Sequence, residues 1–311
     1  MSAKTHPIFP MPYRDRAPQA SSVPIIAECS RSCTTWPPEA APLLLAACAA
    51  VPRYLPIVSA MPPFPPTGVA FSDGLALVAA LELINATHYI ESGMAGGHST
   101  ELVARAFEGR GRRAPLQIHT FEDDSMGYGL YESTRDRLAK WPNVVCHRAN
   151  AILKMPQLLS SLPKASRVFV FVDGPKYEVG YTLLQQMLGR FPIVLLGGLH
   201  DAAPYWSVRL NGLLHGVREQ RLLLTSEQPW RGLFSAAMDE THGERAAMER
   251  LASATRWPSG RLNATLSTGS GAWLGGRPDQ VARLALASKG GACTPLLDLL
   301  LHRLTTVHNK Y

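Results

Sequence analysis

The chain has 311 residues, of which 46% are hydrophobic and 18% are charged, and it carries a formal net charge of +7. This length allows one large domain with appendages, and the apolar fraction excludes a disordered or fibrous protein. The positive residues are dispersed apart from the cluster at residues 110–113, so the charge does not predict a nucleic-acid-binding module.

The cysteines and the apolar segments predict the cellular setting. The five cysteines are an odd number and are scattered along a chain too long to need disulfide bonds, which predicts reduced thiols and a cytoplasmic protein. The N-terminus lacks the charged and apolar segments of a signal peptide, while organellar targeting by the first residues stays open. The apolar segment at residues 40–51 is too short to span a bilayer, which needs about 20 residues.

Proline separates the beginning of the chain from the rest. Fourteen of the 25 prolines lie before Thr67, and proline fixes φ and removes a backbone donor. We therefore expect little regular structure there, apart from a helix near residues 39–51. Three segments are predicted: a proline-rich extension over residues 1–67, a Rossmann-like domain over residues 68–275, and C-terminal helices packed on that domain over residues 276–311.

Beyond residue 68, the patterns of helices and strands alternate. Strands are predicted at residues 89–90, 116–121, 143–147, 167–172, 193–196, 221–225 and 262–267. Helices are predicted at residues 72–85, 99–107, 129–140, 151–162, 177–189, 203–215, 245–254, 280–287 and 295–304, with Ser72 and Ser99 capping the first two. This order predicts an α/β fold with a Rossmann-like, open, mostly parallel seven-stranded sheet and helices on both faces.

The most informative segment is the glycine-rich turn after the first strand, E-S-G-M-A-G-G-H at residues 91–98. Ligands of open α/β sheets bind at the carboxyl ends of the strands. Gly93 permits a sharp turn, Ala95 permits close backbone approach, and Gly97 lets the helix begin tight against the sheet. A dinucleotide site requires G-x-G-x-x-G. Gly93, Ala95 and His98 fill that template at one of its three positions.

The spacing acid-x-G-x-A-x-G resembles the first motif of the class I S-adenosylmethionine-dependent methyltransferases, in the small-molecule O-methyltransferase-like branch. The resemblance covers about residues 75–201. It implies that an acid lies near the amino group of the methionine moiety and that the glycines let the backbone pass close to the cofactor. The cofactor-binding residues implied in this segment are Glu91, Gly93, Ala95, Gly97 and Ser99.

Two further turns carry residues that the resemblance implies for the nucleoside. Glu122 closes the second strand 25 positions after Gly97, where the family has an acid that accepts both ribose hydroxyls, and Asp123 is the alternative acid. Asn150 follows the third strand, where the family usually has an acid near the adenine. An amide there can still bond the exocyclic amine.

The turn after the fourth strand, Asp173-Gly-Pro-Lys176, is similar to the D-x-x-K turn of metal-dependent catechol-type O-methyltransferases. In that family the Asp binds a divalent cation and the Lys is the base. Asp173 and Asp201 would then hold Mg²⁺ through oxygen ligands, although the family's Asp-Asn pair is replaced here. The alternative makes His200 the general base, with Asp173 near the cofactor or as a structural carboxylate.

The sequence therefore predicts an S-adenosylmethionine-dependent methyltransferase whose acceptor is an oxygen or nitrogen of a small molecule. The expected partner is that substrate, with neither nucleic acid nor a membrane span, and a homodimer stays open. Two alternatives remain. One is an NAD-dependent oxidoreductase, which the glycine spacing disfavours. The other is a methyltransferase fold without turnover that serves as a cofactor-binding or scaffold protein.

Overall fold

The computed structural model describes residues 41–61, 69, 71–109, 115–125, 129–175, 177–200, 222–224 and 273–276. Lys176 and Asp201 lie outside the described residues. So do the strand predicted at residues 262–267 and the four helices predicted after residue 200. The division of the chain into an extension, a domain and C-terminal helices stays a prediction.

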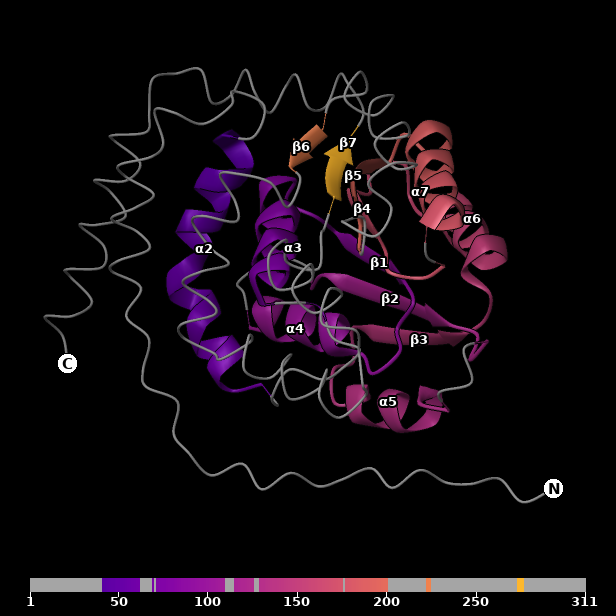
Figure 1. The fold of residues 1–311 in the computed structure, drawn as a ribbon, viewed down its shortest axis with the longest axis horizontal. Helices are drawn as coiled ribbons and strands as arrows, with labels where there is room; N and C mark the ends of the chain where they lie inside the picture. Colours follow the sequence, from indigo (N-terminus) through magenta and orange to yellow (C-terminus); the bar gives the residue numbers. More distant parts are fainter. Residues whose placement is uncertain are drawn as a thin grey trace, which may run out of the picture.

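A sheet forms the centre of the described fold (Figure 1). Its strands are β1 (His88–Ser92), β2 (Gln117–Glu122), β3 (Val144–Arg148), β4 (Val168–Val172), β5 (Val194–Leu199), β6 (Leu222–Leu224) and β7 (Trp273–Gly276). The first five are parallel in the order β3-β2-β1-β4-β5. Strand β7 then pairs antiparallel with both β5 and β6. The predicted α/β class with a mainly parallel sheet is confirmed.

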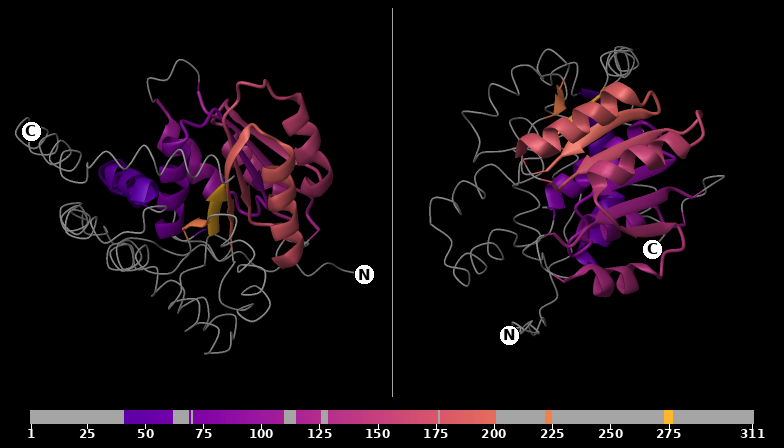
Figure 2. Two further views of the ribbon diagram at one scale, coloured as in Figure 1. Left: turned by 90° about the horizontal axis from the view of Figure 1, so that it is seen from above. Right: turned by 90° about the vertical axis from the view of Figure 1, so that its right-hand side faces the viewer.

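Helices cover both faces of this sheet. They are α2 (Ala41–Ser59), α3 (Phe71–Leu83), α4 (His98–Phe107), α5 (Tyr131–Leu138), α6 (Ala151–Ser161) and α7 (Tyr177–Arg190). Viewed from above, α2 and α3 lie on one side of the sheet, while α6 and α7 lie on the other (Figure 2, left). Two hydrophobic cores follow from this arrangement, one on each face.

Strand β4 shows why the sequence forms a sheet with two covered faces. Its five residues, V-F-V-F-V, are all buried. Phe169 and Phe171 point to the core beneath α2, α3 and α4, whereas the three valines point to the core beneath α6 and α7. Side chains alternate along a strand, so a continuous apolar run supplies both cores at once. The prediction of a strand buried on both faces is confirmed.

Helix α2 begins near the predicted helix at residues 39–51 but continues through Pro52 and Pro56 to Ser59. Val51 and Tyr54 from this helix are buried in the same core as α3 and α4. Part of the proline-rich extension therefore packs on the α/β fold. Tertiary packing outweighs the local cost of a proline within a helix here.

The cysteines correct one expectation about the setting of the protein. Cys48 in α2 is disulfide-bonded, whereas Cys146 in β3 is free. The expectation of reduced thiols is therefore wrong for Cys48, because a disulfide depends on which residues the fold brings together and not on their spacing in the sequence. Among the described helices, none is long and apolar enough to cross a membrane. A cytoplasmic location stays a prediction.

The strand order places the ends of three strands together. Strand β1 lies between β2 and β4: the chain runs from β1 through β2 to β3 on one side, and the connection after β3 crosses to β4 on the other side of β1. In open α/β sheets, the crevice at such a switch point is where ligands bind. The candidate site is therefore expected beyond Ser92, Glu122 and Val172, at the carboxyl ends of β1, β2 and β4.

Candidate functional site

Backbone hydrogen bonds join the turns after β1 and β4. The carbonyl of Ser92 accepts from the amides of Asp173, at 2.8 Å, and Gly174, at 2.9 Å. The Ser92 hydroxyl donates to the Gly174 carbonyl. On the other side of β1, the carbonyl of Phe121 accepts from the amides of Gly93 and Met94, at 3.0 and 3.1 Å. The β1 turn is therefore fixed by both of its neighbours.

The glycines of the turn make contacts within the protein that no other residue permits. Gly93 has φ +91°, and a Cβ atom there would lie 2.5 Å from the Gly174 nitrogen. Gly97 has φ +66°, and a Cβ atom there would lie 2.6 Å from the Thr134 side chain on α5. Positive φ and close approach both favour glycine. The sharp turn predicted at Gly93 agrees with this geometry. At Gly97 the nearest contacts are with α5 and not with the sheet, against which the sequence predicts the helix to begin.

Ala95 and Glu122 connect the β1 turn to the end of β2. The Ala95 amide donates to Glu122 Oε2 at 2.9 Å, and the Asp124 amide donates to Oε1 at 3.0 Å. The two bonds orient the Glu122 carboxylate at the strand end, where it stays partly exposed. Ala95 itself has φ +41°, a conformation that glycine adopts more readily. The position that is glycine in the usual motif is thus alanine here, with a glycine-like backbone.

The Glu91 carboxylate lies inside the protein, beneath the turn. It is fully buried and accepts hydrogen bonds from four hydroxyl groups. Tyr89 and Ser99 donate to Oε1, and Thr100 and Thr120 donate to Oε2. Burial raises the pKa of the Glu91 carboxyl, and the Ser99 and threonine hydrogen bonds oppose that rise. The Glu91 side chain therefore links β1, α4 and β2, and both of its carboxylate oxygens accept hydrogen bonds from the protein itself.

Ser99 is not the N-cap of α4, contrary to the sequence prediction. The helix begins at His98, and Gly97 is the N-cap. Ser99 lies in the first turn, and its hydroxyl donates to Glu91 instead of accepting from a helix amide. The local sequence pattern is misleading because the buried Glu91 carboxylate of β1 competes with the helix amides for the Ser99 hydroxyl. Ser72 likewise lies inside its helix, since α3 begins at Phe71.

Asp123 and Asn150 meet at the ends of β2 and β3. The Asn150 amide donates to Asp123 Oδ2 at 3.0 Å, and Asn150 Oδ1 accepts from the Ile152 amide at 3.0 Å as the N-cap of α6. Hydrogen bonds from Ser125 are the main cause that lowers the pKa of Asp123. Both polar groups of the Asn150 side chain are therefore engaged within the protein.

His200 and Asp173 form a close pair on the other side of β1. His200 Nδ1 lies 2.6 Å from Asp173 Oδ1, and both side chains are largely buried. A bond this short between a histidine and a carboxylate fixes the orientation of the ring. His200 also packs against Phe171, with ring centroids 6.0 Å apart. The structure thus brings together two of the four residues predicted to be catalytic, and the other two lie outside the described residues.

A second carboxylate, which the sequence did not single out, faces the same histidine. Asp73 Oδ2 lies 3.9 Å from His200 Nε2, and the Asp73 side chain is also buried. In the sequence, Asp73 reads as an ordinary acid in the first turn of a helix. Only its burial, unusual for an acid so placed, distinguishes it, and burial is decided by the packing of α3.

The predicted magnesium site finds no support in the structure. Within the described ranges, no group of three or more His, Cys, Asp or Glu side chains is placed to hold a metal ion. Asp173 is engaged by His200, and Asp201 is not among the described residues.

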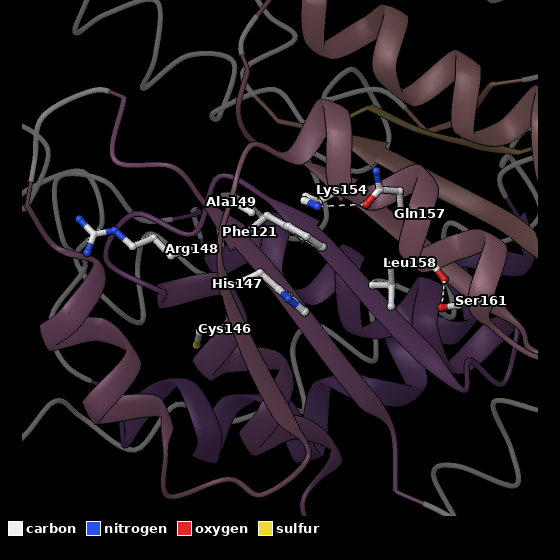
Figure 3. Close-up of a pocket in the computed structure, with 9 residues that line it drawn as sticks. All are labelled: Phe121, Cys146, His147, Arg148, Ala149, Lys154, Gln157, Leu158 and Ser161. Carbon is white, nitrogen blue, oxygen red and sulfur yellow. Dashed lines mark hydrogen bonds between the residues drawn. The ribbon is translucent and has the colours of Figure 1, made fainter.

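A separate pocket of about 530 Å³ lies between β3 and α6 (Figure 3). Its lining residues are Phe121, Cys146, His147, Arg148, Ala149, Lys154, Gln157, Leu158 and Ser161. The Arg148 side chain points away from the others and pairs with Asp124 and Glu132. Glu122, Asp173 and His200 do not line this pocket. It is therefore distinct from the site at the β1 turn.

The chain is similar to several solved structures, each at low sequence identity. No protein-family model and no curated protein matches this chain. Among solved structures, it is similar to the O-methyltransferase TomG from Streptomyces achromogenes in complex with S-adenosylmethionine, with 21% identity over 66% of this chain and 78% of that chain and a TM-score of 0.35. It is also similar to the O-methyltransferase from Bacillus cereus in complex with S-adenosylhomocysteine, with 16% identity, coverage of 64% and 79%, and a TM-score of 0.34.

A third similar structure is the 23S rRNA methyltransferase ErmE, with 16% identity over 68% of this chain and 94% of that chain and a TM-score of 0.33. All three of these solved structures are described as methyltransferases. These likenesses are too distant to transfer residue roles. The roles proposed for individual residues accordingly rest on the strand order and the side chains of this chain.

Proposed function

We propose that this protein is an S-adenosylmethionine-dependent methyltransferase that acts on an oxygen or nitrogen atom of a small molecule. The observation that carries the proposal is the arrangement around the β1 turn. An oriented carboxylate, Glu122, bounds the turn on the β2 side, and the Asp173–His200 pair bounds it on the β4 side. One side suits a ribose diol, and the other suits an acceptor that must lose a proton.

The chemistry of the side chains fits this cofactor. A carboxylate with two oxygens can accept hydrogen bonds from both hydroxyls of a ribose, and Glu122 is partly exposed at the strand end where a nucleoside would lie. Asp173 adds a second negative charge across the turn, which favours a cationic ligand over a pyrophosphate. When bound, the cofactor would supply an electrophilic methyl group on a sulfonium. Glu91 would support the turn from below.

His200 is proposed as the base for the acceptor. Its Nδ1 is held by Asp173 at 2.6 Å, so proton transfer would take place at Nε2. With the cofactor bound, the acceptor oxygen or nitrogen would take its methyl group, the electron pair of the broken bond would stay on sulfur, and the acceptor proton would go to His200 Nε2. Positioning the reactants and removing this proton are the main requirements of such a displacement.

The sheet gives a reason to rank an NAD-dependent oxidoreductase lower. The usual dinucleotide-binding fold continues with a parallel strand at this edge in the order 3-2-1-4-5-6. Here β7 is antiparallel and lies between β5 and β6. Together with the missing G-x-G-x-x-G frame, this strand order favours the methyltransferase over the oxidoreductase.

Isothermal titration tests the cofactor assignment. We expect the parent protein to bind S-adenosylmethionine and Glu122→Gln to bind it at least about 10-fold more weakly, which corresponds to about 1.4 kcal/mol. Glu132→Gln is the matched control, because Glu132 is an exposed residue on α5 that pairs with Arg135 and Arg148. Its affinity should equal that of the parent. Tight binding of NAD without binding of S-adenosylmethionine would overturn the proposal.

Turnover is tested separately, with radiolabelled S-adenosylmethionine and a mixture of small hydroxylated and amine-bearing metabolites. We expect transfer of label by the parent protein and at least a 100-fold loss in His200→Gln with unchanged cofactor affinity. Cofactor binding without transfer to any acceptor would support the alternative of a cofactor-binding or scaffold protein. A small-molecule substrate and a homodimer stay proposals that these measurements address only in part.

A further inference from the structure

We infer that Asp73, near the start of α3, is a positioning residue of the acceptor site, and that it acts through His200. The inference rests on the proposed function, because it assigns a role in the reaction that His200 is proposed to carry. Asp73 lies about 100 residues before Asp173 in the chain, yet both face one histidine. Asp73 therefore adds helix α3, which comes before the strands of the sheet in the chain, to the candidate site.

Asp173 and Asp73 lie on opposite sides of the His200 imidazole ring. Asp173 Oδ1 lies 2.6 Å from Nδ1, and Asp73 Oδ2 lies 3.9 Å from Nε2. The two carboxylates therefore stand at the two nitrogens of the same imidazole. The distance to Asp173 is a hydrogen bond, whereas the distance to Asp73 is longer than one. Asp73 consequently acts on Nε2 through its charge and not through a direct bond.

The fold holds both His200 and Asp73 in defined positions. The His200 amide donates to the Val172 carbonyl at 3.0 Å, which keeps the residue in line with the edge of the sheet. Beside Asp73, Gly74 lies at a close crossing of three helices. A Cβ atom there would lie 2.3 Å from the Tyr54 hydroxyl on α2 and 2.2 Å from the Leu102 side chain on α4. The glycine lets α3 pack tightly there, so Asp73 has a defined position.

The charge of Asp73 matters when His200 takes up the acceptor proton. Nε2 gains a proton when the acceptor loses its own, and the imidazole becomes positively charged. A carboxylate 3.9 Å away stabilises that charge through the Coulomb interaction. The charge is already in place before the proton moves, so no reorganisation of the protein is required. Asp173 orients the ring, and Asp73 stabilises the form of His200 that the reaction produces.

Asp73→Asn tests this role, because the amide keeps the size of the side chain and removes its charge. We expect kcat to fall at least about 10-fold, while the KM for the acceptor and the Kd for S-adenosylmethionine stay within threefold of the parent values. The Asp136→Asn variant is the matched control, since Asp136 is 69% exposed on α5 and pairs only with Arg135 among the contacts described. It should leave kcat unchanged. A kcat for Asp73→Asn within twofold of the parent would overturn the inference.

A second readout does not depend on activity. In protein with ¹⁵N-labelled histidine, the ring nitrogens of His200 are assigned by their loss in His200→Gln, and we expect their shifts to change in Asp73→Asn but not in Asp136→Asn. Unchanged shifts would contradict the inference even if activity fell. If the parent neither binds S-adenosylmethionine nor transfers methyl groups while the His200 shifts still respond, the proposed function fails and the contact between Asp73 and His200 stands. Equal losses of kcat and of cofactor affinity would instead show that Asp73 only holds α3 in place.

Discussion

Gly93 and Ala95 in the β1 turn both have positive φ, but only Ala95 has room for a side chain. Gly93 has φ +91° and is in backbone contact with the β4 turn, whereas Ala95 has φ +41° and carries a side chain. The first position has no room for a Cβ atom, and the second does. The departure from glycine at Ala95 is therefore compatible with the turn, and its cost is limited to the backbone conformation.

We predict that Gly93→Ala is much more costly than a substitution at another glycine with positive φ. Gly109 has φ +63°, and a Cβ atom there would meet no other described residue within 4 Å apart from its chain neighbours, so Gly109→Ala tests the conformation alone. We expect Gly109→Ala to cost about 1 kcal/mol and Gly93→Ala at least about 2 kcal/mol more. Urea unfolding measures both. Equal costs would mean that the β4 turn moves aside easily and that the contact is unimportant.

The Glu91 carboxylate joins three elements of the fold. Its four hydroxyl donors come from β1, α4 and β2, so this one side chain holds the strand, the following helix and the neighbouring strand in register. The resemblance to methyltransferases implied a contact with the cofactor. In the structure, the carboxylate is buried beneath the turn, which favours a role in shaping the turn.

Loss of this carboxylate should destabilise the protein strongly. Glu91→Ala leaves four buried hydroxyl groups without their acceptor, and we expect it to lower the free energy of unfolding by about 3–5 kcal/mol. Glu132→Ala provides the comparison, because Glu132 forms exposed ion pairs worth less than about 1 kcal/mol. Urea denaturation of the two variants gives the difference. A cost for Glu91→Ala near that of the control would show that the hydroxyls find other partners.

Across the fold as a whole, stability should depend on a row of histidines on three adjacent strands. His88 stacks on His119, with ring centroids 6.3 Å apart, and His119 Nδ1 lies 3.0 Å from His147 Nε2. Burial, with a smaller effect from the other two histidines, lowers the pKa of His119 to about 4 from 6.5. The folded protein therefore holds this ring neutral at a pH where the unfolded chain protonates it.

The direction of the pH dependence follows from this difference. Between pH 6.5 and about pH 4 the unfolded state binds more protons at His119, so stability falls as the pH falls through this window. We expect a loss of about 1–2 kcal/mol from His119 between about pH 7.5 and pH 5.0, allowing for its partial exposure. His98, whose pKa burial also lowers to about 4, adds to the loss in the same window.

The contribution of His119 is isolated by comparison with His119→Asn. Urea unfolding at about pH 7.5 and pH 5.0 should show a smaller loss in the variant by about 1 kcal/mol or more, because Asn does not titrate. The His98 contribution is common to both proteins and cancels. The same loss in parent and variant would mean that His119 is protonated in the folded state at little cost.

Local patterns were sufficient for the parts of this protein whose cause is local. The run V-F-V-F-V predicts a doubly buried strand because side chains alternate along a strand. The glycines at positions 93 and 97 predict the turn because glycine, which lacks a Cβ atom, adopts positive φ without strain. Glu122 is predicted at the site because it ends a strand, and parallel strands end at one edge of the sheet. Strand β7, with the sequence W-L-G-G, lacks any such pattern and is not predicted.

The tertiary structure decided which of the candidate side chains meet. The carboxylates of Glu91 and Glu122 both follow apolar strand residues, yet one is buried among hydroxyls and the other is partly exposed. The pairing of His200 with Asp173 and Asp73 joins β4, β5 and α3. These contacts depend on strand order and helix packing, which relate residues far apart in the chain. No local pattern records them, and for that reason Asp73 became visible only in the fold.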